Sequence, residues 1–383
     1  MSEAKVYYAF CSDYESDSLR EALKKAFLPV LAVRGGAQGK SVMIKPNLLE
    51  WKGFEIPVCS HPALMIELCR LLKDEGAAKI AVIENPAVRS TPVIIEKMGI
   101  ADKLAEMGVE VRNCEKYQFV DLDGDCAFRR IEVAQEYKEF DLVIDFAKAK
   151  THCMMTLTLA VKNLFGLIRG SERIGWHLAV GRDYGRFADM LLDIWLLVKP
   201  HISLLDAVVG MEGNGPGSGD PVDLKFIACS DNSLALDSAV SPRLGVNNMP
   251  LLARAQERGL TPGFEEIGEL PEVRALKMPD PPELELEWGV YLPPKLRQMM
   301  RKWFVAKPAV DKKRCIACGM CVKMCPPQSL VLKKGRPVFK LSKCIRCYCC
   351  QEHCPCGAIT SVKTVPMRIA DALERWIKKL LRK

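Results

Sequence analysis

The stretch CIACGMCVKMCP at residues 315–326 recurs as CIRCYCCQEHCP at residues 344–355, with each cysteine of the shared pattern displaced by 29 positions. In both copies two-residue gaps separate three cysteines, and a fourth cysteine follows three residues later, directly before a proline. Such gaps allow three thiolates to surround one four-iron cluster, while the fourth thiolate reaches the cluster of the other copy. The pattern therefore predicts two [4Fe-4S] clusters with crossed ligand sets, which are Cys315, Cys318, Cys321 and Cys354 for the first and Cys344, Cys347, Cys350 and Cys325 for the second.

The repeat is typical of bacterial two-cluster ferredoxins, so we expect a ferredoxin-like α+β domain that transfers electrons. The alternative is a pair of zinc sites, because C-x2-C knuckles also build all-thiolate zinc sites. A zinc ribbon, however, has no use for a third cysteine at the same spacing or for a repeated Cys-Pro end. Cys349 and Cys356 have no place in the ligand scheme. We interpret them as packing residues, with a substitute ligand or a reactive thiol as the alternative.

The length of the chain, 383 residues, predicts a larger unit before the cluster motifs. Ten of the 17 cysteines lie between residues 315 and 356, and the amino terminus lacks a signal-peptide pattern, so we expect reduced thiols in the cytoplasm. Low-potential clusters are usually oxygen-sensitive, which favours an anaerobic or microaerobic host. No apolar run reaches the roughly 18 residues that a membrane span needs.

Charge divides the chain at about residue 291. From there to the end, 22 Lys and Arg stand against 4 Asp and Glu, a net charge of +18, which leaves −10 for residues 1–290. A basic domain predicts an acidic electron carrier, such as a ferredoxin or flavodoxin, or an anionic membrane surface as its partner. No nucleic-acid motif accompanies the basic residues, so we expect no nucleic-acid binding.

Two basic segments also carry apolar residues at helical spacing, one within 295–304 and one over 368–383. Amphipathic helices of this kind predict peripheral contact with the inner face of a membrane. The alternative is that their apolar faces pack on the protein's own core or on a second subunit.

Prolines and poor periodicity mark a domain boundary between residues 262 and 295. We divide the chain into an α/β domain, a linker with the first basic segment, the two-[4Fe-4S] domain and a basic amphipathic helix, at residues 1–262, 263–310, 311–363 and 364–383. In the first domain, apolar runs predict strands over 5–10, 41–44, 79–83, 141–146, 202–209 and 224–228. Between them, helical patterns predict helices over 19–27, 62–74, 93–107, 156–167 and 184–198. This alternation predicts an α/β fold with a mostly parallel sheet flanked by helices, whose active groups gather beyond the carboxyl ends of the strands.

Polar residues follow three of these predicted strands. The first strand end reads Lys45-Pro46-Asn47, and the second contains Lys148, Lys150 and His152, followed by a predicted helix with Lys162 and Asn163. The third strand end is a glycine-rich loop over 210–219, whose glycines include Gly213 and Gly215. Because these ends meet at one edge of the sheet, the lysines predict a pocket for an anionic small molecule. Taken singly, each lysine is also explained by solvation or a carboxylate partner, and the glycine loop by a turn.

His152 and His177 are the predicted proton-transfer groups, because histidine changes its charge near neutral pH. The alternative for each is a structural histidine. The run at residues 35–41 resembles a phosphate-binding loop but precedes a strand and begins one position short, and the glycines at 213–219 lack the order of a dinucleotide site. A flavin is compatible with the sequence, because flavins bind in many ways that leave no short motif.

The quoted segments Lys45-Pro46-Asn47, Lys148-Ala-Lys150-Thr151-His152, Val161-Lys162-Asn163-Leu164-Phe165-Gly166 and Gly210-Met-Glu-Gly213-Asn-Gly215-Pro resemble the family known as domain of unknown function 362. The resemblance spans about residues 4–250, and the family often carries a two-cluster ferredoxin module at its carboxyl end. It implies that the family's motif positions are Lys45, Asn47, Lys150, His152, Lys162, Asn163 and Gly213. A remoter similarity, to nickel-pincer lactate racemases, rests only on a lysine and histidine pair such as Lys162 and His177.

Three functional hypotheses follow from the sequence. The first is an oxidoreductase in which the clusters pass electrons to an anionic substrate or second cofactor, with Lys150, Lys162, His152 and His177 as catalytic residues and Lys45, Asn47, Asn163, Gly213 and Gly215 as binding residues. The second is a non-enzymatic electron-transfer or assembly subunit of a larger complex. The third is an isomerase or transferase in which the clusters are structural or regulatory.

Overall fold

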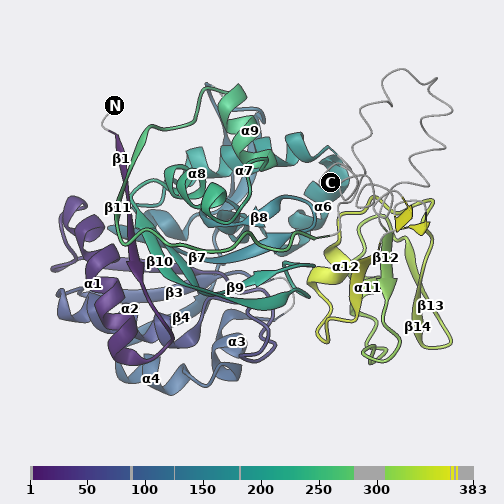
Figure 1. The fold of residues 1–383 in the computed structure, drawn as a ribbon, viewed down its shortest axis with the longest axis horizontal. Coiled ribbons are helices and arrows are strands. Elements are labelled where there is room, and N and C mark those ends of the chain that lie inside the picture. The colour runs from purple at the N-terminus through teal and green to yellow at the C-terminus, as the bar shows by residue number, and fades with distance from the viewer. Residues whose placement is uncertain are drawn as a thin grey trace, which may run out of the picture.

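The computed structural model describes residues 3–86, 89–124, 126–180, 183–279, 307–362, 364–365 and 368–369. An α/β domain forms most of it, and the two-cluster domain lies beside one end of the sheet (Figure 1). The predicted amphipathic segment at 295–304 and nearly all of the one at 368–383 lie outside the described residues. No helix among the described residues is long and apolar enough to cross a membrane.

A 9-stranded sheet forms the centre of the α/β domain, with strand order β11-β1-β10-β9-β7-β2-β3-β4 and β8 paired to β7. Strand β11 pairs in parallel with β1, and neighbouring strands also pair in parallel along the series β9, β7, β2, β3 and β4. Strand β10 lies between β1 and β9 and runs antiparallel to both. The bounds are Ala4–Phe10 for β1, Ser41–Pro46 for β2, Lys79–Glu84 for β3, Val109–Asn113 for β4, Leu142–His152 for β7, Thr156–Thr158 for β8, Ile202–Glu212 for β9, Asp220–Ser230 for β10 and Phe264–Gly268 for β11. The predicted fold class is confirmed, because most strand pairs are parallel and helices flank the sheet.

Helices cover both faces of the sheet. In β10, Phe226 and Ala228 belong to one hydrophobic core and Ile227 and Cys229 to the other, as the two-residue period of a strand requires. The second core takes in α1 (Ser16–Val33), α2 (Pro62–Asp74), α3 (Thr91–Lys97) and α4 (Ala101–Glu106). The first takes in α5 (Ala160–Asn163), α7 (Tyr184–Val198), α8 (Ser233–Arg243) and α9 (Pro250–Glu257). The remaining elements of this domain are β5 (Tyr117–Asp121), β6 (Arg130–Ala134), α6 (Gly170–Val180) and the 3-10 turns η1 (Glu136–Glu139) and η2 (Leu164–Leu167).

The two-cluster domain repeats its backbone as well as its sequence. Left-handed residues occur in pairs 29 positions apart, at Ala317 and Arg346 and at Gly319 and Tyr348. Each copy contributes a short helix and strands, namely β12 (Lys307–Val310), α11 (Met320–Lys323), β13 (Leu330–Lys333), β14 (Arg336–Phe339), α12 (Cys349–Glu352) and β15 (Ile359–Val362). Strand β12 pairs with β15, and β13 pairs with β14.

Three predicted elements are wrong in detail. The predicted helix over 156–167 begins as strand β8, because residues 156–158 pair antiparallel with the end of β7, and only Ala160–Asn163 forms an α-helix. The predicted helix over 93–107 is two helices, α3 and α4, separated by Gly99 at φ +71°. The strand predicted over 141–146 continues to His152, so the residues expected in a loop belong to β7.

Candidate functional site

A cavity of about 80 Å³ lies between the α/β domain and helix α12 of the two-cluster domain. Residues from the ends of β2 and β3, from β7 and β8, and from α5 and α6 line one side, and Cys349, Glu352 and His353 line the other. The α/β side contributes Asn47, Glu84, Lys150, Thr158, Lys162, Asn163, Arg173 and His177. The structure thus brings together most of the candidate residues that the sequence predicted.

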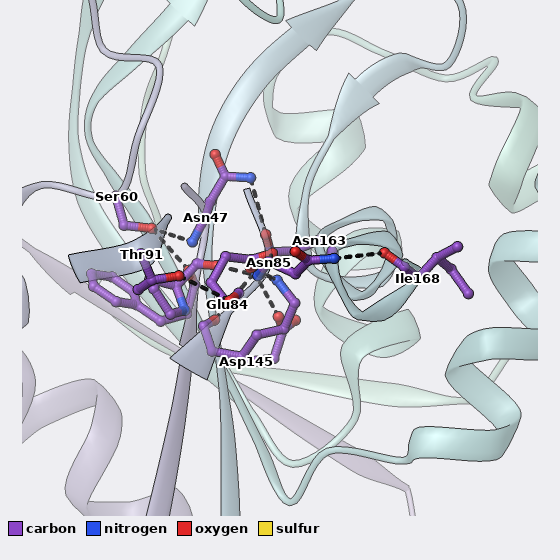
Figure 2. Close-up of polar contacts among 12 residues, drawn as sticks. Asn47, Ser60, Glu84, Asn85, Thr91, Asp145, Asn163 and Ile168 are labelled. Carbon is purple, nitrogen blue, oxygen red and sulfur yellow. Dashed lines mark hydrogen bonds and ion pairs between the residues drawn. The ribbon is translucent and has the colours of Figure 1, made fainter. Parts of the chain in front are cut away.

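A chain of side-chain hydrogen bonds runs beneath this cavity (Figure 2). Lys150 Nζ donates to Asn47 Oδ1 at 2.6 Å, Asn47 Nδ2 donates to Asn163 Oδ1 at 3.0 Å, and Asn163 Nδ2 donates to Asp145 Oδ1 at 2.7 Å. The side-chain amides of Asn47 and Asn163 therefore each accept a hydrogen bond from the Lys150 side and donate one toward Asp145. These contacts fix the orientation of both amides. Asp145 Oδ2 is buried and has no hydrogen-bond partner within the described part of the chain, and burial raises the pKa of this carboxyl to about 7.

Lys150 is the lysine whose protonation is easiest to change. Its Nζ donates to Asn47 Oδ1 and to the carbonyl of Val58 at 2.7 Å, both uncharged oxygens, and the described residues give it no ion pair. Burial lowers the pKa of Lys150 to about 7, helped by the nearby charge of Lys162. An ammonium group of that pKa can bind an anion or release a proton near neutral pH.

Two other predicted lysines are neutralised by carboxylates. Lys45 forms a buried ion pair with Glu84, and Gly166 permits it, since a Cβ at that glycine would lie 2.7 Å from Lys45 Nζ. Lys148 pairs with Asp206 at 2.8 Å and also donates to the hydroxyl of Tyr14. Lys148 was predicted to help form the anion pocket, but it does not line the cavity and its charge is already compensated.

Lys162 and Arg173 present cationic groups to the cavity without carboxylate partners among the described residues. Lys162 makes only a cation–π contact, with its Nζ 5.8 Å from the ring centroid of Phe165. Arg173 donates to backbone carbonyls, at 3.0 Å to Ile168 and 2.7 Å to Gly166. Burial lowers the pKa of both groups. An anion in the cavity would therefore meet two cations that form no close ion pair and that the carboxylates of Glu84 and Glu352 compensate only at longer range.

His152 connects the two domains. Its Nδ1 accepts hydrogen bonds from the backbone amides of Met154 and Met155, at 3.0 and 3.1 Å, so its proton must reside on Nε2. That Nε2 lies 3.0 Å from Glu352 Oε1 and donates to it. Burial lowers the pKa of His152 to about 4. Burial alone would raise the pKa of Glu352, but the hydrogen bond from His152 and the charge of Lys162 bring it well below its usual range. The pair is thus a neutral imidazole holding a carboxylate.

Three polar atoms around the cavity have no hydrogen-bond partner among the described residues, although they are buried. They are Thr158 Oγ1, His177 Nδ1 and His353 Nδ1. The His177 ring stacks on Phe187 with ring centroids 4.9 Å apart, and burial lowers its pKa to about 4. Buried polar atoms are nearly always satisfied, so these atoms fit a site that holds water or a polar ligand.

The glycine-rich loop packs against β7. The Gly213 amide donates to the carbonyl of Lys277 at 2.6 Å, and its carbonyl accepts from Thr151 Oγ1. A Cβ at Gly215 would lie 2.0 Å from the carbonyl oxygen of Thr151, so no larger residue fits there without movement. The close approach places Pro216 in the cavity wall. Binding of a cofactor by Gly213 and Gly215 stays a prediction, since their observed contacts are with the protein.

The eight motif cysteines gather around two further cavities. One is lined by Cys315, Cys318, Cys321 and Cys354, and the other by Cys325, Cys344, Cys347 and Cys350. Among the described residues, no three His, Cys, Asp or Glu side chains converge on a single-ion site. The backbone amides of Ser329 and Ala358 each lie 3.2 Å from the thiol of the motif-ending cysteine, Cys325 and Cys354. Four thiols around a cavity, with amides directed at sulfur, fit a four-iron cluster, and the assignment of the individual ligands stays a prediction.

Helix α12 joins the second cysteine set to the interdomain cavity. Its Cys350 lines the second cluster cavity, while the adjacent Cys349 lines the interdomain cavity. Gln351 Nε2 donates to the carbonyl of Asn214, and Gln351 Oε1 lies 3.4 Å from Cys153 Sγ. The packing is close, because a Cβ at Gly217 would lie 3.2 Å from the Glu352 carbonyl oxygen. A predicted cluster ligand is therefore the direct chain neighbour of a residue in the cavity wall.

Sequence reasoning missed several residues of this site, namely Glu84, Asp145, Thr158, Arg173, Glu352 and His353. Asp145 lies in a predicted strand and Glu84 directly follows one, and carboxylates at such positions were a detectable signal. Glu352 lies inside the cluster motif, 200 residues from the histidine that it contacts, and no local pattern indicates that pairing.

Comparison with known proteins adds the family. The model of a family described as a domain of unknown function (DUF362) matches residues 42–241, and a 4Fe-4S dicluster domain matches residues 314–358. The thylakoid-associated protein sll1697 of Synechocystis sp. is 29% identical over 257 residues, which cover 66% of this chain and 79% of that protein.

Proposed function

We propose, from the premise that this chain belongs to the DUF362 family and ends in a 4Fe-4S dicluster domain, that it is an iron–sulfur oxidoreductase acting on a small anion in the interdomain cavity. The observation that carries the proposal is the position of the cavity, with cations that form no close ion pair among the described residues on one wall and the segment after Cys347 on the other. The two clusters, held by the eight motif cysteines, supply single electrons.

The cations select the substrate class. Lys162 and Arg173 lack carboxylate partners among the described residues, and the orphaned Thr158 hydroxyl adds a hydrogen-bonding group. The cavity of about 80 Å³ is well below the roughly 300–1,000 Å³ of sites for drug-sized ligands. We therefore propose a small carboxylate or oxoanion as substrate in preference to a flavin.

Lys150 is the proposed proton donor for the reduction. Its pKa of about 7 lets the ammonium form exist at neutral pH and lose a proton readily, and a chain of two amides holds its Nζ in place. His152 acts as a positioning residue, because its Nδ1 is occupied by two amides and its Nε2–H holds Glu352. The two clusters would supply the two electrons of a reduction. For an oxoanion such as nitrate, one N–O bond breaks and the oxygen leaves as water with one proton from Lys150 and one from solvent, while reduction of a carboxylate to its aldehyde takes a third proton from solvent.

An acidic ferredoxin or flavodoxin is the proposed electron donor, and the cytoplasm the proposed location. The description of the cyanobacterial relative as thylakoid-associated supports peripheral contact with a membrane. The second hypothesis, an electron-transfer or assembly subunit, needs no small-molecule site, and the unsatisfied cations and polar atoms of the cavity favour the enzyme.

Anaerobic purification with iron, sulfide, flavin and nickel quantified is the first test. We expect about eight irons and eight sulfides without flavin or nickel. The protein, reduced with photoexcited 5-deazariboflavin, is then mixed with formate, acetate, nitrate or bicarbonate while cluster reoxidation is followed by absorbance.

The decisive comparison uses variants that keep the clusters. Lys150→Met and Lys162→Met should abolish anion-dependent reoxidation, whereas the exposed Lys103→Met should leave it unchanged. Equal reoxidation by all four proteins would contradict the enzyme, and reoxidation only by a partner protein would support the subunit instead.

A further inference from the structure

The two cysteine sets differ in exposure. In the first set Cys318 is exposed and Cys315 half-buried, whereas all four cysteines of the second set are buried. Helix α12, which contains Cys350 of the second set, packs against the α/β domain (Figure 1). The first set therefore lies at the part of the domain that a protein in solution can reach.

Exposed apolar side chains surround Cys318. Ile316 is 65% exposed and lines the first cluster cavity. Leu332 of β13 is 48% exposed and adjoins Gly319, where a Cβ would lie 3.6 Å from its Cδ1 atom. A small apolar centre next to an exposed cluster ligand has the layout of a protein interface, where apolar contacts at the centre exclude water.

Basic side chains form the rim of this centre. Lys312, Lys313 and Arg314 precede the first motif and are exposed, and Lys333, Lys334 and Arg336 lie at the β13–β14 turn and are exposed too. Arg336 donates to the carbonyl of Lys312 at 2.8 Å, which holds the two basic groups side by side. We call the surface formed by Lys312, Lys313, Arg314, Ile316, Leu332 and Lys334 the cluster-one corner.

Little negative charge offsets the corner. Residues 307–362 contain eleven Lys and Arg but only two carboxylates. Glu352 is buried at the interdomain interface, and Asp311 lies 3.8 Å from Arg314. Among the described residues, the lysines of the corner form no ion pair.

We propose that an acidic electron-carrier protein docks on the cluster-one corner. Charge complementarity argues for an acidic partner, and the exposed ligand Cys318 argues for a redox protein in preference to a lipid surface, which exchanges no electrons. This proposal rests on the proposed oxidoreductase function and adds the surface at which electrons enter the protein. It does not depend on which substrate occupies the interdomain cavity.

The test measures binding and cluster reduction without any substrate. The probe is an acidic flavodoxin, and the readouts are its dissociation constant by anaerobic calorimetry and the second-order rate at which its hydroquinone reduces the clusters. The variant is Lys312→Glu/Lys313→Glu/Lys334→Glu. The matched control, Lys24→Glu/Lys103→Glu/Lys138→Glu, makes the same charge change on exposed lysines of the α/β domain.

In 50 mM NaCl we expect the corner variant to weaken binding and slow reduction at least tenfold, because steering by surface charge changes association rates by roughly 10 to 1,000-fold. The control should stay within twofold, and 400 mM NaCl should remove most of the difference. Reduction by uncharged 5-deazariboflavin radical should be equal in all three proteins.

Equal slowing by the control, or wild-type kinetics in the corner variant, would overturn the proposal. If the corner variant loses its clusters, the test is the rate at which flavodoxin reduces the wild-type clusters at low and high salt. A rate that does not change with salt would overturn the proposal. Vesicles of phosphatidylglycerol and phosphatidylcholine form the last arm. Loss of vesicle binding in the corner variant with unchanged flavodoxin kinetics would assign the corner to lipid and refute docking of a carrier.

Discussion

Binding of a small anion should weaken with rising pH because Lys150 loses its proton. The pKa of Lys150 is lowered to about 7, so the cavity should hold the charged form at pH 6 and mostly the neutral form at pH 8. Formate, nitrate and sulfate are suitable probes, because none of them titrates between pH 6 and 9. The dissociation constant should be flat near pH 6 and rise above pH 7.

The size of the effect follows from the charges. Two unit charges about 4 Å apart attract by about 4 kcal/mol at an effective dielectric constant of about 20. At about 1.4 kcal/mol per pKa unit, a bound anion raises the pKa of Lys150 by about 3 units. The dissociation constant should then approach a tenfold rise per pH unit above the pKa and increase about 50-fold between pH 7 and pH 9, because half of Lys150 is already neutral at pH 7. Asp145, at the end of the hydrogen-bond chain from Lys150, also has a pKa of about 7, and its ionisation would give a break in the same range that persists when Lys150 is replaced. His177, with a pKa of about 4, and Glu352, whose pKa lies below its usual range, do not titrate there.

Anaerobic calorimetry on wild type and three variants measures the effect. Lys150→Met should weaken binding at every pH and remove the break, and Lys150→Arg should bind without a break because guanidinium stays charged. Lys162→Met should weaken binding and keep the break but move it above pH 7, because the charge of Lys162 helps to lower the pKa of Lys150. A dissociation constant that does not change from pH 6 to 9, or a break that survives Lys150→Met, would refute the assignment of this titration to Lys150.

Three further outcomes are expected. Lys148→Met should lower the free energy of unfolding by about 3–5 kcal/mol, because it leaves Asp206 buried and unpaired, and Lys148→Met/Asp206→Leu should recover much of the loss in urea titrations. His152→Ala should increase hydrogen exchange in α12, since it removes a hydrogen bond to a charged group worth about 1.5–3 kcal/mol; unchanged exchange would contradict the role of this contact between the domains. Gly215→Ala should disturb the loop and lower anion affinity, while Gly263→Ala, where a Cβ would meet only the Glu3 side chain at 3.8 Å, serves as the control.

Sequence reasoning performed best where chemistry depends on short spacing. The cluster motif and the polar residues at strand ends are local patterns, and Lys45, Asn47, Lys150, Lys162 and Asn163 all lie at or beneath the cavity. The sequence predicts the segment of β8 as part of a helix, because residues 156–167 have helical spacing, while the pairing of Lys150 with Thr158 is a contact that spacing does not encode.

Charge compensation was the least predictable feature. Lys148 and Lys150 look equivalent in the sequence, yet only Lys148 meets a carboxylate, Asp206 of β9, and the register of β7 and β9 shifts between the two lysines. Arg173 and Glu352 were missed because each acts across a long sequence separation. The structural environment, and not the residue type, therefore decides which cation is available to a ligand.

Hyperfine spectroscopy of the reduced protein with 13C-formate tests the central claim most directly, because it asks whether an anion lies next to a cluster. The account predicts 13C coupling to a reduced cluster in the wild type, retained in Lys103→Met and lost in Lys162→Met. Formate that binds by calorimetry but shows no coupling to either cluster would place the anion elsewhere and contradict the claim.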